Sequence, residues 1–143
     1  MSIEVLEFAD VYLFRFGPLF AWEDLMELHQ LFKVYYYPPP DHWRHRLIDL
    51  RQTRAIDLDY QRVTEYVRLL TSTPAPPDLK IALVVASPLI LGYARMFQTL
   101  IDPVVQRVEI FEEMAPALDW LAVVEVTRQA LAPVSSPSKA GSP

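Results

Sequence analysis

Three histidines and two aspartates of this chain could suggest a metal site, because imidazole and carboxylate groups suit zinc. They are His29, Asp41, His42, His45 and Asp49. The spacing of His42 and His45 would place two ligands together on a helix, but this pair follows a run of prolines and enters an expected strand. In a strand, residues three apart point to opposite faces. The spacing therefore favours ordinary histidines, and neither a metal nor another cofactor is expected.

Asp57, Asp59 and Glu65 could supply paired carboxylates for acid–base catalysis, which requires one carboxyl group whose pKa is raised by burial. Two aspartates before an amphipathic stretch are better explained as helix caps that accept the free amides of the first turn. Ser87 is followed by Pro88 and lacks the Gly-x-Ser-x-Gly elbow of a nucleophile, so it also fits a helix cap. No catalytic residue is predicted, and the chain is not expected to be an enzyme.

Composition excludes several further classes of function. The 143 residues carry a formal net charge of -5 and no basic run, so nucleic acid is a poor partner. The chain has no cysteine, which excludes disulfides and thiolate chemistry, and its three glycines are too few for a phosphate-binding loop. The longest uncharged apolar run, 81–94, has about 14 residues, whereas a membrane span needs about 20. Residues 1–4 do not resemble a secretory signal, so a cytoplasmic protein without a membrane span is expected.

Gly92 and Arg95 lie in an expected helix, and each could serve either the packing of the fold or the binding of a ligand. A glycine inside a helix costs about 1 kcal/mol relative to alanine, so it often marks close approach of another element or of a ligand. Tight packing of the helix is the favoured interpretation. Arg95 lies off the apolar stripe and could pair with Asp102, Glu112 or Glu113, or bind an anionic ligand. The ion pair is favoured.

An aromatic and proline-rich block is the least ordinary surface feature of the sequence. It comprises Tyr35, Tyr36 and Tyr37, the prolines 38–40, and Trp43. Rings of this block that do not face the core would form an exposed apolar patch, and such patches often mark contact with a partner.

Hydrophobic periodicity predicts strands alternating with helices. Strands are expected at 3–8, 11–16, 46–50, 81–86 and 108–111. Helices are expected at about 20–34, 59–70, 89–100 and 115–131. The order β-β-α-β-α-β-α-β-α predicts one α/β domain over residues 1–132, with a mixed sheet of four or five strands and helices mainly on one face. Residues 133–143 are expected to be a disordered tail.

Apolar side chains indicate which face of each element is buried. The first two strands should form a hairpin, and the continuous apolar run 81–86 should be a central parallel strand. The expected inward stripes are Val63, Tyr66, Val67 and Leu70; Leu89, Tyr93, Met96, Phe97 and Leu100; and Ala117, Leu118, Leu121 and Val124.

Three blocks in the last third of the ordered chain carry a family resemblance. They are the Gly-Tyr-Ala-Arg-Met-Phe block at 92–97, the strand at 108–111 and the Ala-x-x-Trp-Leu block that ends at Leu121. Together with the order of elements, they resemble the STAS domain of SpoIIAA-like anti-sigma-factor antagonists, and more closely small bacterial STAS/SEC14-like proteins. The resemblance implies a STAS-like fold without a common assigned reaction.

The resemblance also implies a protein partner. SpoIIAA-like proteins carry a phosphorylatable serine in an Asp-Ser-Ser-Gly-like turn, where this chain has Asp57-Leu58-Asp59-Tyr60. A phosphorylation switch is therefore not expected. The first hypothesis is a non-enzymatic, regulatory protein-interaction module, including a homodimer. Its expected surface, within 52–60 and 35–43, comprises Asp57, Asp59, Tyr60, Tyr36, Tyr37 and Trp43.

A second hypothesis is a binder of a small apolar or lipid-like ligand, as the SEC14 comparison implies. This version needs a cavity between helices and sheet, and the candidate lining residues are Tyr93, Arg95, Phe97 and Trp120. An apolar pocket would favour the ligand and a solid core would exclude it. An enzyme is the least favoured hypothesis.

Overall fold

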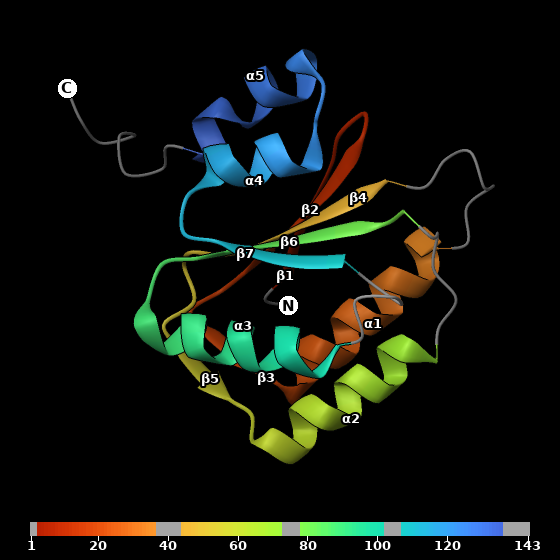
Figure 1. The fold of residues 1–143 in the computed structure, drawn as a ribbon, viewed down its shortest axis with the longest axis vertical. Helices are drawn as coiled ribbons and strands as arrows, with labels where there is room; N and C mark the ends of the chain where they lie inside the picture. Colours follow the sequence, from red (N-terminus) through yellow and green to blue (C-terminus); the bar gives the residue numbers. More distant parts are fainter. Residues whose placement is uncertain (1–2, 37–43, 73–77, 102–106, 136–143) are drawn as a thin grey trace.

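The computed structural model describes residues 3–36, 44–72, 78–101 and 107–135, without the side chains of 32–36 and 132–135. Within these residues a five-stranded sheet lies between two groups of helices, as Figure 1 shows. The aromatic side chains of Tyr36, Tyr37 and Trp43 therefore lie outside the described part of the chain.

The main sheet has the spatial order β1-β2-β4-β6-β7. Its strands are β1 (Ile3–Glu7), β2 (Val11–Phe16), β4 (His45–Leu50), β6 (Lys80–Val85) and β7 (Arg107–Phe111). The strands β1 and β2 form the expected antiparallel hairpin, and every other neighbouring pair is parallel. The predicted mixed sheet is therefore confirmed, with β6 inside it and β7 at its edge.

A separate ladder joins two strands that the periodicity did not predict. It pairs β3 (Leu19–Ala21) with β5 (Ala55–Asp57) in parallel. Each strand has only three residues, which is too short for an alternating pattern to be recognised. Residue 20, which was expected to begin a helix, instead belongs to β3.

Five helices flank the main sheet within the described residues. They are α1 (Trp22–Tyr36), α2 (Tyr60–Thr71), α3 (Pro88–Leu100), α4 (Met114–Leu121) and α5 (Glu125–Ser135). In Figure 1, α1, α2 and α3 lie below the sheet and α4 and α5 lie above it. Three of the five thus share one face, as expected, and the other face is covered by α4 and α5.

The inner strands are buried on both faces because their alternate side chains enter two separate cores. On β2, Phe14 and Phe16 join the core beneath α1–α3, whereas Leu13 joins the core beneath α4 and α5. On β6, Leu83 and Ala82 divide in the same way. This arrangement explains why these strands are apolar at nearly every position.

Two predicted caps begin α2 and α3. The Asp59 carboxylate accepts a hydrogen bond from the Arg62 backbone N–H at 2.8 Å. The Ser87 hydroxyl accepts one from the Ile90 N–H at 3.3 Å, with Pro88 at the start of α3. Both caps are confirmed, and the predicted α2 stripe at Val63, Tyr66, Val67 and Leu70 is buried.

The predicted last helix is two helices. Ala122 has a φ of 56°, in the left-handed region, and this residue ends α4. The Asp10 carboxylate then accepts hydrogen bonds from the Val124 N–H and the Thr127 hydroxyl, both at 2.7 Å, and so fixes the start of α5. As a result, Val124 is 49% exposed rather than inward. The helix α5 also extends to Ser135, two residues beyond the expected start of the tail, and 136–143 lie outside the described residues.

The inward face of α3 differs by about one position from the predicted stripe. Leu89 is 53% exposed, while Ile90 and Ala94, which lie one turn apart, are buried against the sheet. No helix in the described ranges is long and apolar enough to cross a membrane.

Candidate functional site

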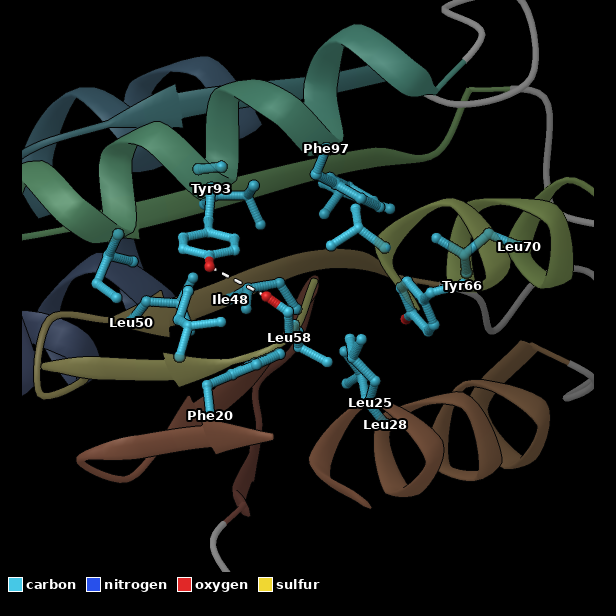
Figure 2. A pocket seen from close by; sticks show the side chains of 16 residues that line it. Phe20, Leu25, Leu28, Ile48, Leu50, Leu58, Tyr66, Leu70, Tyr93 and Phe97 are labelled. Carbon is cyan, nitrogen blue, oxygen red and sulfur yellow. Dashed lines mark hydrogen bonds between the residues drawn. The ribbon is translucent and has the colours of Figure 1, made fainter. Parts of the chain in front are cut away.

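An apolar cavity of about 100 Å³ lies between the main sheet and the helices α1, α2 and α3. Sixteen residues line it, and none of them is charged. They are Phe20, Leu25, Leu28, Ile48, Leu50, Ile56, Leu58, Val63, Tyr66, Leu70, Ile81, Leu83, Ile90, Tyr93, Ala94 and Phe97. Figure 2 shows these side chains converging from α1, α2, α3, the sheet and the β3–β5 ladder.

Ala94 is the smallest of the side chains that line the cavity. Tyr66 of α2 and Phe97 of α3, which also line it, pack against each other with ring centroids 6.1 Å apart and so join the two helices. The space left beside Ala94 has a lining that is almost entirely apolar.

The size of the cavity determines what it can hold. Pockets for drug-sized ligands are typically about 300–1,000 Å³. Apolar cavities of roughly 150 Å³ stay dry and bind benzene or xenon. A cavity of about 100 Å³ therefore has room for a small apolar molecule or for the end of a longer one.

One hydrogen bond between residues of the cavity wall ties α3 to the segment before α2. The Tyr93 hydroxyl donates to the backbone carbonyl of Leu58 at 3.0 Å, the dashed line in Figure 2. Leu58 lies between β5 and the Asp59 cap, so this bond closes the cavity wall between α3 and the start of α2.

An open depression of about 370 Å³ lies on the other side of Tyr93. Its walls are Tyr60, Pro88, Leu89, Gly92, Tyr93 and Met96. Tyr60 is 61% exposed and Leu89 is 53% exposed, so large apolar side chains face the solvent here. We refer to this feature as the outer depression.

Gly92 does not have the role predicted for it. A Cβ atom added at Gly92 would meet no atom within 4 Å, so the glycine is not required for close packing of α3. It faces open space in the outer depression instead. The prediction of tight packing is therefore wrong, because Gly92 lies on the exposed side of the helix.

Two of the four predicted ligand-binding residues line the cavity and two do not. Tyr93 and Phe97 lie on its wall. Arg95 is exposed, because the rotation of about 100° per residue turns it away from the sheet, and it forms no ion pair with a described residue. Trp120 belongs to α4 on the opposite face, where its ring packs 5.9 Å from that of Phe111.

The described half of the predicted partner surface surrounds the start of α2. Asp57 ends β5 and is exposed, Asp59 caps α2, and Tyr60 lines the outer depression. For Tyr36 the structure gives only its place at the end of α1, and Tyr37 and Trp43 lie outside the described residues. The assignment of this surface stays a prediction.

Two of the candidate metal ligands, His45 and Asp49, have hydrogen-bond partners in the structure, whereas Asp41 and His42 lie outside the described residues. His45 Nδ1 accepts a hydrogen bond from the Lys80 N–H at 3.0 Å. Burial and then the positive charge of Lys80 lower the pKa of His45, which favours the neutral imidazole that this bond requires. No three potential metal ligands gather in the part of the chain that the structure describes.

Asp49 lies in a buried ion-pair network on the α4 side of the sheet. Its Oδ1 accepts from Arg51 Nε at 2.9 Å and its Oδ2 from Arg15 Nε at 3.2 Å. Burial alone would raise the pKa of Asp49, but hydrogen bonds from the Arg51 side chain and backbone, together with Arg15, outweigh it and lower the pKa. The carboxylate thus stays ionised and stabilises the ends of β2 and β4.

Sequence reasoning missed the contribution of the β3–β5 ladder to the cavity. Phe20, Ile56 and Leu58 line it, and none of them was named as a candidate. The alternation Ile56-Asp57-Leu58-Asp59 has the period of two that indicates a strand, and this was the available signal. The two aspartates suggested a helix cap instead.

Comparison with known proteins gives one line of evidence about the fold. No family model matches the chain, and no curated protein matches it. Among solved structures, it is similar to an uncharacterized protein of the DUF3478 family with a SpoIIAA-like fold from Shewanella loihica PV-4. The TM-score is 0.54 at 18% sequence identity, over 84% of this chain and 92% of the other. The chain therefore has a SpoIIAA-like α/β fold, as its sequence blocks indicated.

Proposed function

We propose that the protein is a non-enzymatic binding module that takes up a small apolar molecule in the cavity beneath α1, α2 and α3. The observation that carries this proposal is the cavity itself, with its sixteen uncharged lining residues. Its walls offer no charged group to a reaction, and the carboxylates of Asp10, Asp49 and Asp59 are engaged in hydrogen bonds elsewhere.

The expected affinity follows from the size of the cavity. Burial of apolar surface contributes roughly 25 cal/mol per Å², and a very small ligand gains at most about 1.5 kcal/mol per heavy atom. A molecule with few heavy atoms is therefore expected to bind with a Kd on the order of 0.1–1 mM.

Xenon and benzene are suitable probes, and methyl chemical shifts are a suitable readout. Saturable shifts are expected at Leu25, Leu28 and Leu70, which line the cavity. Leu118 and Leu131 belong to the core on the other face of the sheet and serve as an internal control in the same spectrum. The proposal fails if no lining methyl shows a saturable shift, or if both faces respond equally.

Substitutions that fill the cavity with a larger side chain test the same proposal. Ala94→Leu places three additional carbons in the space beside the sheet, and Val63→Ile is a milder alternative if the first variant is unstable. Both variants should weaken binding, Ala94→Leu to below detection. The matched control is Ala130→Leu, the same change at an exposed position of α5. Equal binding by Ala94→Leu and Ala130→Leu would contradict the proposal.

A second candidate function is a regulatory, protein-interaction module. The exposure of Tyr60 and Leu89 beside Asp57 and Asp59 supports it, because apolar side chains with a charged rim are typical of an interface. The expected partner is a protein segment with an apolar side chain for the outer depression and a basic residue for the acidic rim. Such a module would act without a phosphoserine, since Asp59 carries a fixed charge at the start of α2.

Light scattering after size-exclusion chromatography tests the homodimer form of this candidate. The wild type should show a mass that rises with concentration, and Tyr60→Asp/Leu89→Asp should remain a monomer. For a different partner, Tyr60→Ala/Leu89→Ala should lose a binding protein that wild type and Val124→Ala/Val126→Ala both retain. The variant Val124→Ala/Val126→Ala truncates two exposed side chains, one in α5 and one just before it, away from the outer depression. A monomeric wild type whose binding partners are unchanged by the Tyr60 and Leu89 substitutions would exclude this candidate.

A further inference from the structure

The geometry points to one continuous binding site, in which Tyr93 is a movable wall between the cavity and the outer depression. The ligand class that fits this site is an unbranched apolar chain, with its end in the cavity and its remainder in the depression. This inference rests on the proposed function, because it takes the cavity as the place where the apolar molecule binds.

The first observation is that Tyr93 is shared. It lines the cavity together with Leu58 and Phe97, and it lines the outer depression together with Leu89 and Gly92. Tyr93 is the one residue that the linings of this cavity and this depression have in common. In the continuous site that we infer, rotation of the Tyr93 ring joins the two spaces.

The second observation is that one hydrogen bond holds this wall in place. The Tyr93 hydroxyl is bound to the Leu58 carbonyl at 3.0 Å, and Figure 2 shows the ring pointing toward Leu58. Because the ring is only partly buried, the hydroxyl can exchange this partner for water when it rotates outward. A bond of this kind shifts an opening equilibrium by roughly fivefold, which is small enough for frequent opening.

The third observation is Gly92. Its exposed position inside α3 is unfavourable for the helix, and no neighbouring atom requires the absence of a side chain there. A long side chain at this position would extend into the outer depression, whose wall Gly92 forms. The glycine therefore keeps the approach to Tyr93 open.

These observations define the shape of the ligand. The cavity has room for only a few carbon atoms, whereas the outer depression is open to solvent and has apolar walls from Pro88, Leu89 and Met96. The passage between them is the width vacated by one phenol ring, which admits a straight chain more readily than a branched one. Each additional methylene that is buried should then improve affinity about fourfold.

Primary alcohols of increasing length, from butanol to decanol, test this inference on the full-length protein. With the wild type, affinity should rise about fourfold per methylene beyond the length that the cavity alone can hold. Tyr93→Phe should raise the rate of ligand exchange about fivefold while leaving the affinity for xenon unchanged. Exchange rates can be measured from methyl line shapes during the titration.

Gly92→Met should fill the outer depression, and its matched control Gly92→Ala should not. In Gly92→Met the affinity series is expected to level off at the shorter alcohols, with xenon binding preserved. The continuous site is wrong if xenon binds but affinity levels off at the same alcohol length in the wild type as in Gly92→Met. It is also wrong if Gly92→Met and Gly92→Ala behave alike. In either case binding is confined to the cavity beneath α1, α2 and α3. If xenon itself does not bind, the proposed function and this inference both fail.

Discussion

Among single residues, Gly92 offers a direct test of the structure. An added Cβ would meet no atom within 4 Å, so Gly92→Ala should gain helix stability without any steric cost. The expected gain is up to about 1 kcal/mol in the free energy of unfolding, measured by urea denaturation followed by circular dichroism. Arg95→Ala, at another exposed position of α3, should change stability by less than about 0.5 kcal/mol. A destabilised Gly92→Ala would restore the interpretation that the glycine marks close packing.

Asp49 is a buried charge whose removal should destabilise the protein. Its side chain is 1% exposed and it pairs with both Arg15 and Arg51, so Asp49→Asn removes the buried carboxylate that these two guanidinium groups share, while Arg15 keeps its ion pair with the exposed Glu4. The expected loss is about 3 kcal/mol in the free energy of unfolding near pH 7. The control is Glu4→Gln, which removes a carboxylate that is 56% exposed and should cost less than about 1 kcal/mol.

The stability that Asp49 contributes should decrease as the pH falls. The pKa of Asp49 is lowered in the folded protein, so its contribution is complete above the unfolded pKa of about 3.9 and is lost as the pH falls through the folded value. Unfolding curves of wild type and Asp49→Asn should therefore differ by a constant amount between pH 5 and 7 and converge only in acid. Convergence near neutral pH would show that the charge does not stabilise the folded state.

At the scale of elements, the junction between α4 and α5 depends on one unusual backbone conformation. Ala122 has a φ of 56°, which glycine adopts more readily than alanine. Ala122→Gly should therefore raise the free energy of unfolding by about 0.5–1 kcal/mol. The same change in the middle of α5, Ala130→Gly, should lower it by about 1 kcal/mol. Thermal melting measures both changes in stability. If both substitutions stabilise the protein, or both destabilise it, the left-handed conformation of Ala122 is contradicted.

The elements that the sequence predicted are those with a clear local period. The hairpin, the apolar strand β6 and the inward stripe of α2 each repeat over six or more residues, which is enough to identify them. The strands β3 and β5 have three residues each and form through pairs such as Leu19 with Ala55, which no local pattern contains. The break at Ala122 also lacked a signal, because neither glycine nor proline occurs there.

Across the whole molecule, the sheet separates two cores that should respond independently to substitution. Leu131 of α5 is fully buried in the core on one face of the sheet, whereas Leu28 lines the cavity on the opposite face. Leu131→Ala and Leu28→Ala should each cost about 3 kcal/mol in the free energy of unfolding. Only Leu28→Ala should change the binding of apolar molecules, by admitting larger ones. Methyl-shift titration with benzene measures this difference, and a similar effect of Leu131→Ala would mean that the two cores are coupled.

The candidate site was less predictable than the fold for a physical reason. Tyr93 and Phe97 were identified because they recur at helical spacing, but whether space remains beneath them depends on the distance between helix and sheet. Arg95 was named as a possible contact for an anionic ligand although it lies off the apolar stripe, and in the structure it is exposed and does not line the apolar cavity. Trp120 was misplaced because the sequence did not indicate that α4 crosses to the other face of the sheet.

The order of strands in the sheet has a consequence for how the chain is made. The spatial order β1-β2-β4-β6-β7 is also the order along the sequence. During synthesis from the N-terminus, each new strand of this sheet can therefore pair with an edge that already exists, beginning from a local hairpin. No strand of the sheet has to insert between two earlier ones, so assembly on the ribosome needs no rearrangement of earlier pairs.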